Sequence, residues 1–337
     1  MTVEVTQGGG RSVAFITLGC AKNEVDSEKM RAKAKAAGYR IEQDPEKADA
    51  VVINTCSFIQ SATEESLEAI FEAAGMENVA SGDAKLIVAG CMPARYGDEL
   101  AAELTEACAF VPCSKEDDLG EILNALFGGS PERDAADDGT DDEPSSVSAY
   151  VKISDGCDNR CSFCAIPLIR GGYRSRRMED ILEEARGLAE SGVKELNLVA
   201  QDTTKYGQDL YGEYSLDKLL TELCKIDGFH WIRVLYGYPD RVTDGLLEVM
   251  AREPKVVKYI DLPLQHASGR VLKEMNRKGD FDSLCALMQR IRDKVPGVVL
   301  RTTLLAGFPG QPVEAFEPLC AFVRTVRFSR LGFFAFS

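Results

Sequence analysis

Apolar residues recur along the chain in short blocks that predict strands, each followed by a stretch with the apolar spacing of a helix. In the first third of the sequence, buried strands are expected at 13–18, 50–54 and 86–89. Regular alternation of strand and helix is typical of a parallel sheet covered by helices. We therefore expect an open parallel α/β domain over residues 1–127.

The same alternation resumes at about residue 149 and predicts a second domain over 149–337. Six strands are expected, at 150–153, 195–199, 232–235, 257–262, 298–305 and 331–336. One intervening helix is closed by Gly192, and Ser215 is expected to cap another. Six such units predict a partial (β/α)6 barrel whose active site lies at the carboxyl ends of the strands. The sixth strand reads as buried, and the sequence stops after it without a closing helix.

The stretch between the two domains, 128–148, is acidic and lacks large apolar side chains over most of its length. Such a composition predicts a flexible linker. The whole chain has a net charge of -15, which argues against a broad nucleic-acid surface and favours a basic protein as partner. No apolar run is long enough to span a bilayer, and the polar start does not resemble a secretion signal, so a cytoplasmic protein without membrane contact is expected.

Three cysteines form a compact CxxxCxxC triplet, Cys157, Cys161 and Cys164, directly after the first strand of the second domain. Disulfides are rare in a reducing cytosol, so closely spaced cysteines there more often bind metal. A set of three, rather than four, leaves one ligand position open for chemistry. Half of a zinc knuckle or three coincidental core cysteines are the alternatives.

A second set of three is dispersed along the first domain. Cys20, Cys56 and Cys91 each follow a predicted strand. The carboxyl ends of parallel strands share one edge of a sheet, which is where ligands bind, so we expect these thiols to form a second cluster site. Cys108 and Cys113 show no such pattern, and Cys224, Cys285 and Cys320 lie in helical patterns; these five are expected to be core or incidental thiols.

The triplet, Phe163 before its third cysteine and the six βα units together resemble the radical S-adenosylmethionine (SAM) enzymes. The three additional cysteines, with the stretches TLGCAKN (17–23), NTCSFI (54–59) and AGC (89–91), resemble the methylthiotransferases within that group. Four further stretches resemble the branch that modifies an aspartate of ribosomal protein S12 (uS12): QDTTKYG (201–207), YGYP (236–239), DLPLQH (261–266) and LAGFPG (305–310).

The resemblance implies two 4Fe-4S clusters and SAM as cofactors. The cluster of the barrel would bind SAM and cleave it to a 5′-deoxyadenosyl radical, while the auxiliary cluster, held by Cys20, Cys56 and Cys91, would carry the sulfur to be transferred. Partners would be uS12 or the ribosome and an external electron donor. The family normally carries a further small carboxyl-terminal β domain, which is missing from this sequence. Alternatives are the same chemistry on a tRNA adenosine, which would bring nucleic-acid contact, and a non-enzymatic iron-sulfur carrier.

Several other residues are expected at the reactive rim of the barrel because they lie at predicted strand ends. Candidates for contact with SAM are Asp155, Gly156, Phe163, Gln201, Asp202, Gln265, His266 and Gly307. For His266 the alternative is a hydrogen-bonded structural histidine. The basic loop after the triplet contributes Arg170 and Arg176 as candidates for binding a substrate carboxylate by paired hydrogen bonds, or it is simply a solvated loop.

Overall fold

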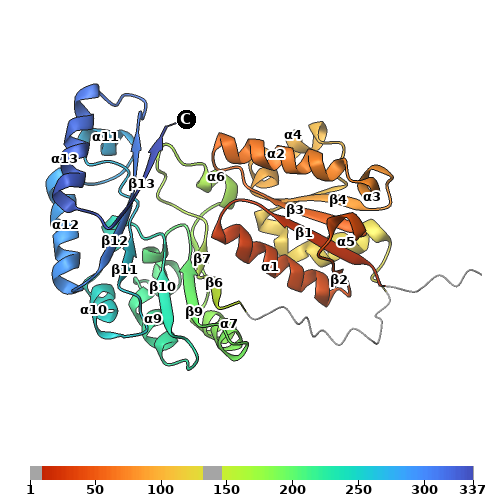
Figure 1. Cartoon of the computed structure of the whole chain (residues 1–337), viewed down its shortest axis with the longest axis horizontal. Coiled ribbons are helices and arrows are strands. Elements are labelled where there is room, and N and C mark those ends of the chain that lie inside the picture. The colour runs from red at the N-terminus through yellow and green to blue at the C-terminus, as the bar shows by residue number, and fades with distance from the viewer. Residues whose placement is uncertain (1–9, 132–145, 337) are drawn as a thin grey trace, which may run out of the picture. The chain divides into compact units, whose positions relative to one another are not determined.

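A computed structural model describes residues 10–131 and 146–336 and contains two compact units (Figure 1). The first unit comprises the described residues up to 131 together with Leu168–Arg170. The second comprises 146–167 and 171–336. Most of the segment expected to be a linker, 132–145, lies outside the described residues.

The first unit is built on one parallel sheet with the strand order β2-β1-β3-β4-β5. Its strands are β1 (Ser12–Thr17), β2 (Arg40–Ile41), β3 (Ala50–Thr55), β4 (Lys85–Gly90) and β5 (Ala109–Pro112). Its helices are α1 (Ala21–Ala36), α2 (Gln60–Ala74), α3 (Glu77–Ala80), α4 (Cys91–Glu103) and α5 (Leu119–Phe127), with 3-10 turns η1 (Pro45–Lys47) and η2 (Cys113–Asp118). The three expected strands are present, and the short β2 and β5 were not expected.

Helices cover both faces of this sheet. Side chains of α1 and α5, among them Met30 and Leu123, pack with one set of strand residues, while α2 and α4 pack on the opposite face through Ile70 and Met92. Every residue of β3 is therefore buried, as expected of a parallel strand at the centre of a covered sheet. The open α/β architecture predicted for this region is confirmed.

The second unit contains six parallel strands arranged as two three-stranded sheets, β10-β9-β6 and β11-β12-β13. They are β6 (Ser148–Lys152), β9 (Glu195–Val199), β10 (Trp231–Val234), β11 (Tyr259–Asp261), β12 (Val299–Ala306) and β13 (Arg330–Ala335). Two backbone hydrogen bonds of Ile232, with Lys255 and Val257, link the sheets just before β11. The six expected strands are thus present in the expected order, as a partial barrel.

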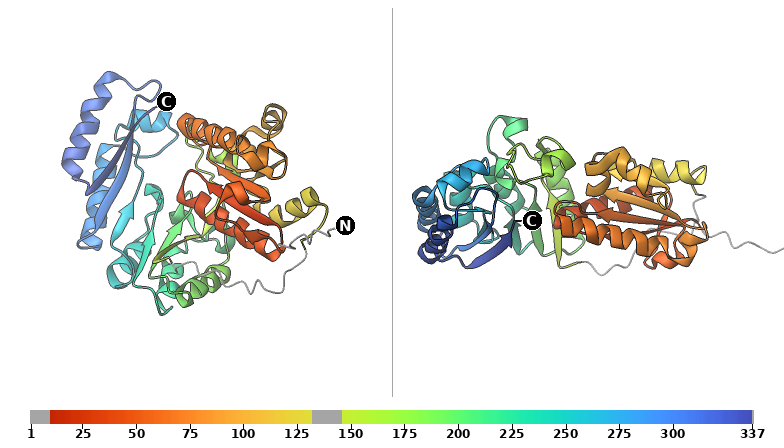
Figure 2. Two further views of the ribbon diagram at one scale, coloured as in Figure 1. Left: turned by 45° about the vertical axis from the view of Figure 1, so that its right-hand side comes forward. Right: turned by 90° about the horizontal axis from the view of Figure 1, so that it is seen from above.

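Helices α7 (Met178–Glu190), α9 (Leu216–Cys224), α10 (Asp244–Arg252), α11 (Gly269–Glu274), α12 (Phe281–Lys294) and α13 (Phe316–Val326) connect these strands. Shorter elements are β7 (Ser154–Asp155), β8 (Arg174–Ser175), α6 (Ile166–Arg170), α8 (Gln208–Tyr211) and the 3-10 turns η3 (Thr203–Lys205), η4 (Pro239–Arg241) and η5 (Val313–Ala315). One continuous hydrophobic core joins the strands to the helices, which line the outer side of the strands (Figure 2).

Two local expectations were wrong. Ser215 precedes α9, but its hydroxyl donates to the carbonyl of Glu213 and does not cap the helix. The last strand, β13, is exposed rather than buried: Phe333 and Phe334 are 52% and 55% exposed, because β13 has only β12 as a neighbour among the described strands. No helix in the described parts of the chain is both long and apolar enough to cross a membrane.

Candidate functional site

The first cysteine set lies at the carboxyl edge of the sheet in the first unit. Cys56 and Cys91 directly follow β3 and β4, and Cys20 immediately precedes α1 in the turn after β1. These three strands are neighbours in the sheet, so residues 71 positions apart in the sequence share one edge. The structure therefore brings together the three thiols that the sequence placed there.

Two glycines allow the backbone to approach this edge closely. A Cβ atom on Gly19 would lie 2.6 Å from the Cβ of Cys56, and a Cβ on Gly90 would lie 2.2 Å from Oδ1 of Asn54. Both glycines also have φ values near +90°, which other residues rarely adopt. The local sequence Gly-Cys is thus a steric requirement at two of the three cysteines.

Asn23 is the polar residue that the thiols share. Its Nδ2 donates to the carbonyls of Leu18 and Thr55, at 3.0 and 2.9 Å, which directs Oδ1 toward the cysteines. The Sγ atoms of Cys20 and Cys91 lie 3.8 and 3.9 Å from this oxygen. The amide is fully buried and fixes the spacing of the two sulfurs.

Arg170 belongs to the first unit and lies beside Cys91. Its Nη2 is 3.0 Å from Oδ1 of Asn23 and 3.8 Å from Sγ of Cys91, and its Nη1 is 2.9 Å from Oδ2 of Asp26. The side chains of Arg170 and Asp26 are only 2% and 1% exposed. In the structure Arg170 pairs with the carboxylate of Asp26, and its expected role in binding a substrate carboxylate stays a prediction.

A fourth cysteine lies at the same edge, contrary to the expectation that Cys113 is incidental. It directly follows β5, the strand next to β4, so it is the neighbour of Cys91 at this edge. The sequence concealed this arrangement because β5 is only four residues long and ends in proline. Cys108, by contrast, is exposed.

The cysteines at this edge differ in their electrostatic surroundings. The hydrogen bond with Cys113 and the nearby Arg170 guanidinium lower the pKa of Cys91 to about 6, against the effect of burial. Burial raises the pKa of Cys56. The hydrogen bond with Cys91, followed by burial, raises the pKa of Cys113. The surroundings therefore favour a thiolate at Cys91 over one at Cys56 or Cys113.

The second set, the CxxxCxxC triplet, lies on a loop of the second unit that begins at Gly156. This glycine has φ +72°, and a Cβ added to it would lie 2.1 Å from the carbonyl oxygen of Gly172. The next amide, that of Cys157, donates to the carbonyl of Gly171 at 3.1 Å. The turn therefore requires glycine at its first position.

Polar residues between the three cysteines anchor the loop. Asp158 accepts from the amide of Tyr173 at 3.0 Å and pairs with Lys205 at 2.6 Å. The carbonyl of Arg160 accepts from Nδ2 of Asn276 at 2.8 Å, and the amide of Ser162 donates to the carbonyl of Met275 at 3.1 Å. The spacing residues of the motif thus hold the loop on residues far along the sequence.

Asp202 also anchors the loop, through Asn159, and is 1% exposed. Its carboxylate accepts from Nδ2 of Asn159 at 3.1 Å, from Nη1 of Arg241 at 2.7 Å and from the hydroxyl of Thr204 at 2.6 Å. These three contacts engage both oxygens and hold the side chain in place, and the expected contact with SAM stays a prediction.

Arg277 provides a positive charge at the triplet. Its guanidinium donates to Sγ of Cys161 at 3.6 Å and to the carbonyl of Pro263 at 2.7 Å. The same guanidinium lies over the ring of Tyr238, 4.4 Å from its centroid, and Arg241 also contacts that ring. Burial raises the pKa of Cys164 to about 11 and also raises that of Cys157, so these two require a bound cation to become thiolates.

Buried polar atoms without a partner among the described residues lie at the strand ends of the barrel. Both amide atoms of Gln201 and Nε2 of His266 are in this state. Nδ1 of His266 accepts from the amide of Ser268, which leaves the proton on Nε2 as an available donor. Gln265 has φ +71°, an uncommon conformation for a residue other than glycine. These features fit a polar ligand at this end of the barrel.

The remaining candidates are placed as follows. Asp155 pairs with Lys152 and accepts from the amide of Gly156, and Phe163 packs against the hydrophobic core. Gly307 is exposed, and its amide donates to Gln311. Arg176 contacts Glu184 and the carbonyl of Lys152. Their expected roles in binding SAM or substrate stay predictions.

Within the described residues, no three His, Cys, Asp or Glu side chains converge closely enough for one metal ion. A 4Fe-4S cluster has no such requirement, because each thiolate binds a different iron. The donor chemistry of both sets, three thiols beside an arginine, therefore fits the expected clusters.

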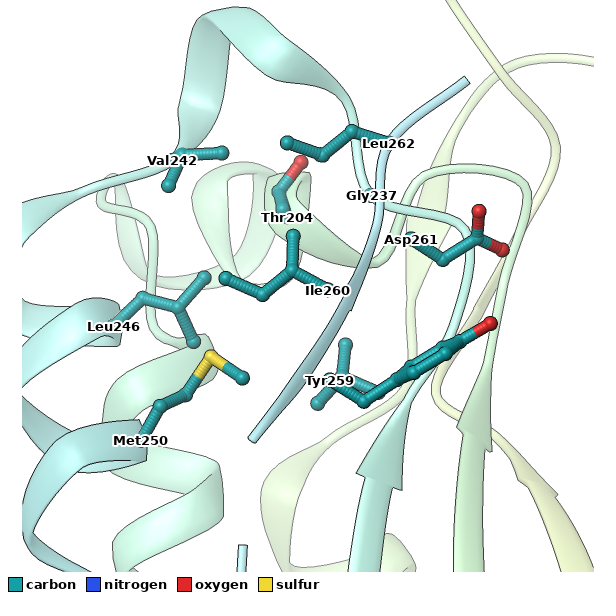
Figure 3. Close-up of a pocket in the computed structure, with 10 residues that line it drawn as sticks. Thr204, Gly237, Val242, Leu246, Met250, Tyr259, Ile260, Asp261 and Leu262 are labelled. Carbon is teal, nitrogen blue, oxygen red and sulfur yellow. The ribbon is translucent and has the colours of Figure 1, made fainter. Parts of the chain in front are cut away.

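A small cavity in the second unit does not belong to either site (Figure 3). Its lining is mainly apolar and includes Leu246 and Met250 of α10 and Ile260 of β11. The carboxylate of Asp261 points away from Leu246 and Met250 and is paired with Arg301 at 2.7 Å. The cavity is therefore a space in the packing rather than a polar binding pocket.

Sequence reasoning missed the residues that surround the cysteines. For three of them the sequence offered only their position near a strand end: Asn23 and Asp26 lie on α1 after β1, and Cys113 directly follows β5. Arg277 and Asn276 could be recognised in the sequence only as part of a polar run, Asn276 to Lys278, that follows α11. Nothing in the sequence pairs that run with Cys161.

Comparison with known protein families and proteins identifies both units. Residues 12–111 match the uncharacterized protein family UPF0004, and residues 151–323 match the radical SAM superfamily. The ribosomal protein uS12 methylthiotransferase RimO of Anaeromyxobacter sp. (strain Fw109-5) is 49% identical over 95% of this chain and 69% of its own length. RimO of Clostridioides difficile (strain 630) is 44% identical over 96% of this chain and 75% of its own length.

Solved structures show the same fold at low sequence identity. The radical SAM methyltransferase TsrM of Kitasatospora setae has a TM-score of 0.68 at 14% identity and covers 96% of this chain and 72% of its own. The cobalamin-dependent SAM radical enzyme OxsB has a TM-score of 0.65 at 12% identity and covers 93% of this chain and 52% of its own. The predicted fold and the radical SAM assignment are confirmed, and the chain belongs to the RimO family of radical SAM methylthiotransferases.

Proposed function

We propose that this protein adds a methylthio group to the β-carbon of an aspartate in ribosomal protein uS12, with SAM and two 4Fe-4S clusters as cofactors. One observation carries the proposal. Similarity to proteins named as uS12 methylthiotransferases extends over 95% of the chain and so includes both cysteine-bearing units.

In the second unit, Cys157, Cys161 and Cys164 would hold a cluster with one iron free of protein ligands. When bound, this cluster and SAM supply the one-electron chemistry needed to remove hydrogen from an unreactive carbon. The contribution of the chain is to hold and orient the reactants. Asp202 fixes the loop through Asn159, and Arg277 places a positive charge at Cys161.

The polar atoms without partners support a SAM site at the same end of the barrel. Nε2 of His266 is a buried donor, and Gln201 offers both a donor and an acceptor. SAM carries amino, carboxylate and hydroxyl groups that would satisfy such atoms. Unpaired buried polar groups cost stability, so ligand contacts there are favoured.

In the first unit, Cys20, Cys56 and Cys91 would hold the auxiliary cluster, from which the transferred sulfur is supplied. The edge of the sheet presents the three thiols around the buried amide of Asn23. Cys91, whose pKa is lowered to about 6, is prepared to bind iron because the thiolate is the ligand form.

The partners follow from the chemistry and the charge. An external electron donor is needed because each radical step consumes an electron. A net charge of -15 supports encounter with a basic protein rather than with an exposed phosphate backbone. We place the reaction in the cytoplasm, where ribosomes are assembled.

The test is to reconstitute the protein anaerobically and to supply dithionite and SAM with either uS12 or unmodified tRNA. We expect 5′-deoxyadenosine in the reaction and a methylthio group on one aspartate of uS12, detected by mass spectrometry. Methylthioadenosine in tRNA with unmodified uS12 would assign the tRNA substrate instead. If the loaded protein forms no 5′-deoxyadenosine, the iron-sulfur carrier would be favoured.

A further inference from the structure

Among the described residues, two neighbours distinguish the Cys91 thiol from the other thiols of the auxiliary site. One is Cys113. In the parallel pair β4 and β5, Gly90 is in register with Pro112, so Cys91 and Cys113 are the next residues of two adjacent strands. This register makes the two thiols neighbours at the edge of the sheet, and Cys113 lowers the pKa of Cys91.

The second partner is Arg170, which approaches Cys91 from a segment distant in the sequence. Its Nη2 lies 3.8 Å from Sγ of Cys91, at the long end of hydrogen bonds to sulfur. Its Nη1 is held by Asp26, and Nη2 also donates to Asn23, so the orientation of the guanidinium is fixed. Both charged side chains are almost completely buried.

Hydrogen bonds to a ligand sulfur have a known effect on iron-sulfur clusters. They stabilise the more negatively charged, reduced state and raise the reduction potential. A buried positive charge acts in the same direction, since Coulomb interactions are stronger away from water. The carboxylate of Asp26 opposes the effect of Arg170 in part, and Glu116 is a negative charge near Cys113.

We propose that Cys113 and Arg170 are positioning residues of the auxiliary cluster: both donate to the Cys91 sulfur when it ligates iron, and both raise the reduction potential of that cluster. The proposal rests on the proposed function, in which Cys91 is one of three ligands. It assigns Arg170 to the auxiliary cluster, although Arg170 follows Cys164 of the other cluster by only six positions.

The same geometry separates Cys113 from the ligands. Its sulfur hydrogen-bonds a ligand sulfur, whereas ligand sulfurs on different irons are held apart by the cluster between them. Cys113 is thus expected to act on the cluster through Cys91 and not by binding iron.

The test uses the full chain with Cys157, Cys161 and Cys164 all changed to alanine, so that bound iron reports only the auxiliary site. In this background we would compare Cys113→Ala, Cys113→Ser, Arg170→Gln and Arg170→Lys. Cys108→Ala is the matched control, because Cys108 is an exposed thiol five residues before Cys113. Iron and sulfide content, circular dichroism and the midpoint potential from an EPR-monitored redox titration are measured for each.

Cys113→Ala and Arg170→Gln are expected to keep the iron but to lower the midpoint potential. At the midpoint of the parent protein, the ratio of oxidised to reduced cluster should rise about tenfold, as expected for loss of one hydrogen bond to a charged group. Cys113→Ser and Arg170→Lys retain a donor or the charge and should show smaller shifts. Cys108→Ala should show none.

Three outcomes would contradict these assignments in distinguishable ways. If the parent background holds no iron, the proposed function fails at its auxiliary site. If iron is retained and the midpoint potentials of Cys113→Ala and Arg170→Gln equal that of Cys108→Ala, the proposal alone is overturned. If folded Cys113→Ser and Cys113→Ala both lose the iron, Cys113 is a ligand and the proposal is again overturned.

Discussion

The two cysteine sites are built in opposite ways. The triplet of the second unit occupies one short loop, and its three thiols are close in space because they are close in sequence. The auxiliary site is assembled from the ends of three separate strands, and its thiols are close only because β1, β3 and β4 are adjacent in one sheet. A local sequence motif therefore determines the triplet site, whereas the order of the strands in the sheet determines the auxiliary site.

The surroundings of the two sites reverse this contrast. The local triplet depends on distant anchors, since Asp202, Asn276 and Arg277 lie 38 to 120 positions after Cys157 to Cys164 in the sequence. The dispersed auxiliary site also has anchors that are close in the sequence: Asn23 and Asp26 lie on α1, shortly after Cys20. Each site thus combines one local and one long-range component.

The largest expected effect separates the two sites by their iron. Changing Cys56 to alanine should remove the auxiliary cluster and half of the iron and sulfide, and changing Cys157 to alanine should remove the other half. Cys285→Ala is the matched control, because Cys285 lies on α12 in the hydrophobic core. Chemical analysis of anaerobically purified protein measures the content.

The two losses should be independent, since the ligand sets share no residue. Loss of all the iron in either single variant would show that the two sites form only together. Retention of all the iron in Cys56→Ala would contradict a cluster bound by Cys56. Cys285→Ala is expected to keep the full content.

The sequence predicted the barrel strands closely because each is an apolar run bounded by polar residues. Strand 195–199 was predicted with the bounds that the structure has, and the other five were within two residues at each end. β5 escaped detection because four residues that end in proline carry little periodic signal. Cys113 was consequently taken for an incidental thiol.

Side-chain contacts were the other limit. The pattern placed Arg170 correctly in a basic loop, but the pattern could not show that its partner is Asp26, 144 positions earlier. Similarly, Asp202 was expected at the rim of the barrel, where it lies, yet its engagement with Asn159 and Arg241 depends on packing that no single segment encodes. The place of a residue along a helix or strand can be predicted from its own segment, whereas the partner of its side chain cannot.

A smaller effect compares the buried ion pairs at the two sites. Asp26→Ala removes the buried carboxylate that neutralises the guanidinium of Arg170, which should lower the free energy of unfolding by about 3–5 kcal/mol. Asp202→Ala should cost less, because the side chain of Arg241 is 19% exposed and can be solvated. Asp117→Ala is the control, since Asp117 forms an exposed pair with Lys29 and should cost about 1 kcal/mol or less.

Hydrogen exchange read by mass spectrometry would localise each change, which matters because a chain with two units need not unfold in one step. Asp26→Ala should increase exchange in α1 and at the ends of β1 and β3, and Asp202→Ala should increase it in residues 157–164. An increase confined to the same peptides in both variants would show that the two ion pairs do not act separately.

The smallest effect tests the glycine that opens the triplet loop. Gly156 and Gly171 both have φ +72°, so alanine at either position introduces backbone strain, and ψ of −161° at Gly171 lies in a region that is essentially limited to glycine. A Cβ on Gly156 would in addition lie 2.1 Å from the carbonyl oxygen of Gly172, whereas a Cβ on Gly171 would meet nothing within 4 Å. We expect this contact to lower the free energy of unfolding of Gly156→Ala by about 1 kcal/mol beyond its backbone strain, within the usual range for overpacking.

Only Gly156→Ala should also reduce the iron bound by the triplet, because the backbone must move to relieve the contact and Cys157 is the next residue. Urea unfolding of the iron-free protein and iron analysis of the loaded protein measure the two effects separately. Equal stability and equal iron content in the two variants would mean that the loop yields to the added methyl group, and the close approach at Gly172 would then not be what holds Cys157 in place. Reduced iron in Gly171→Ala alone would instead assign that role to the hydrogen bond between the Cys157 amide and the Gly171 carbonyl.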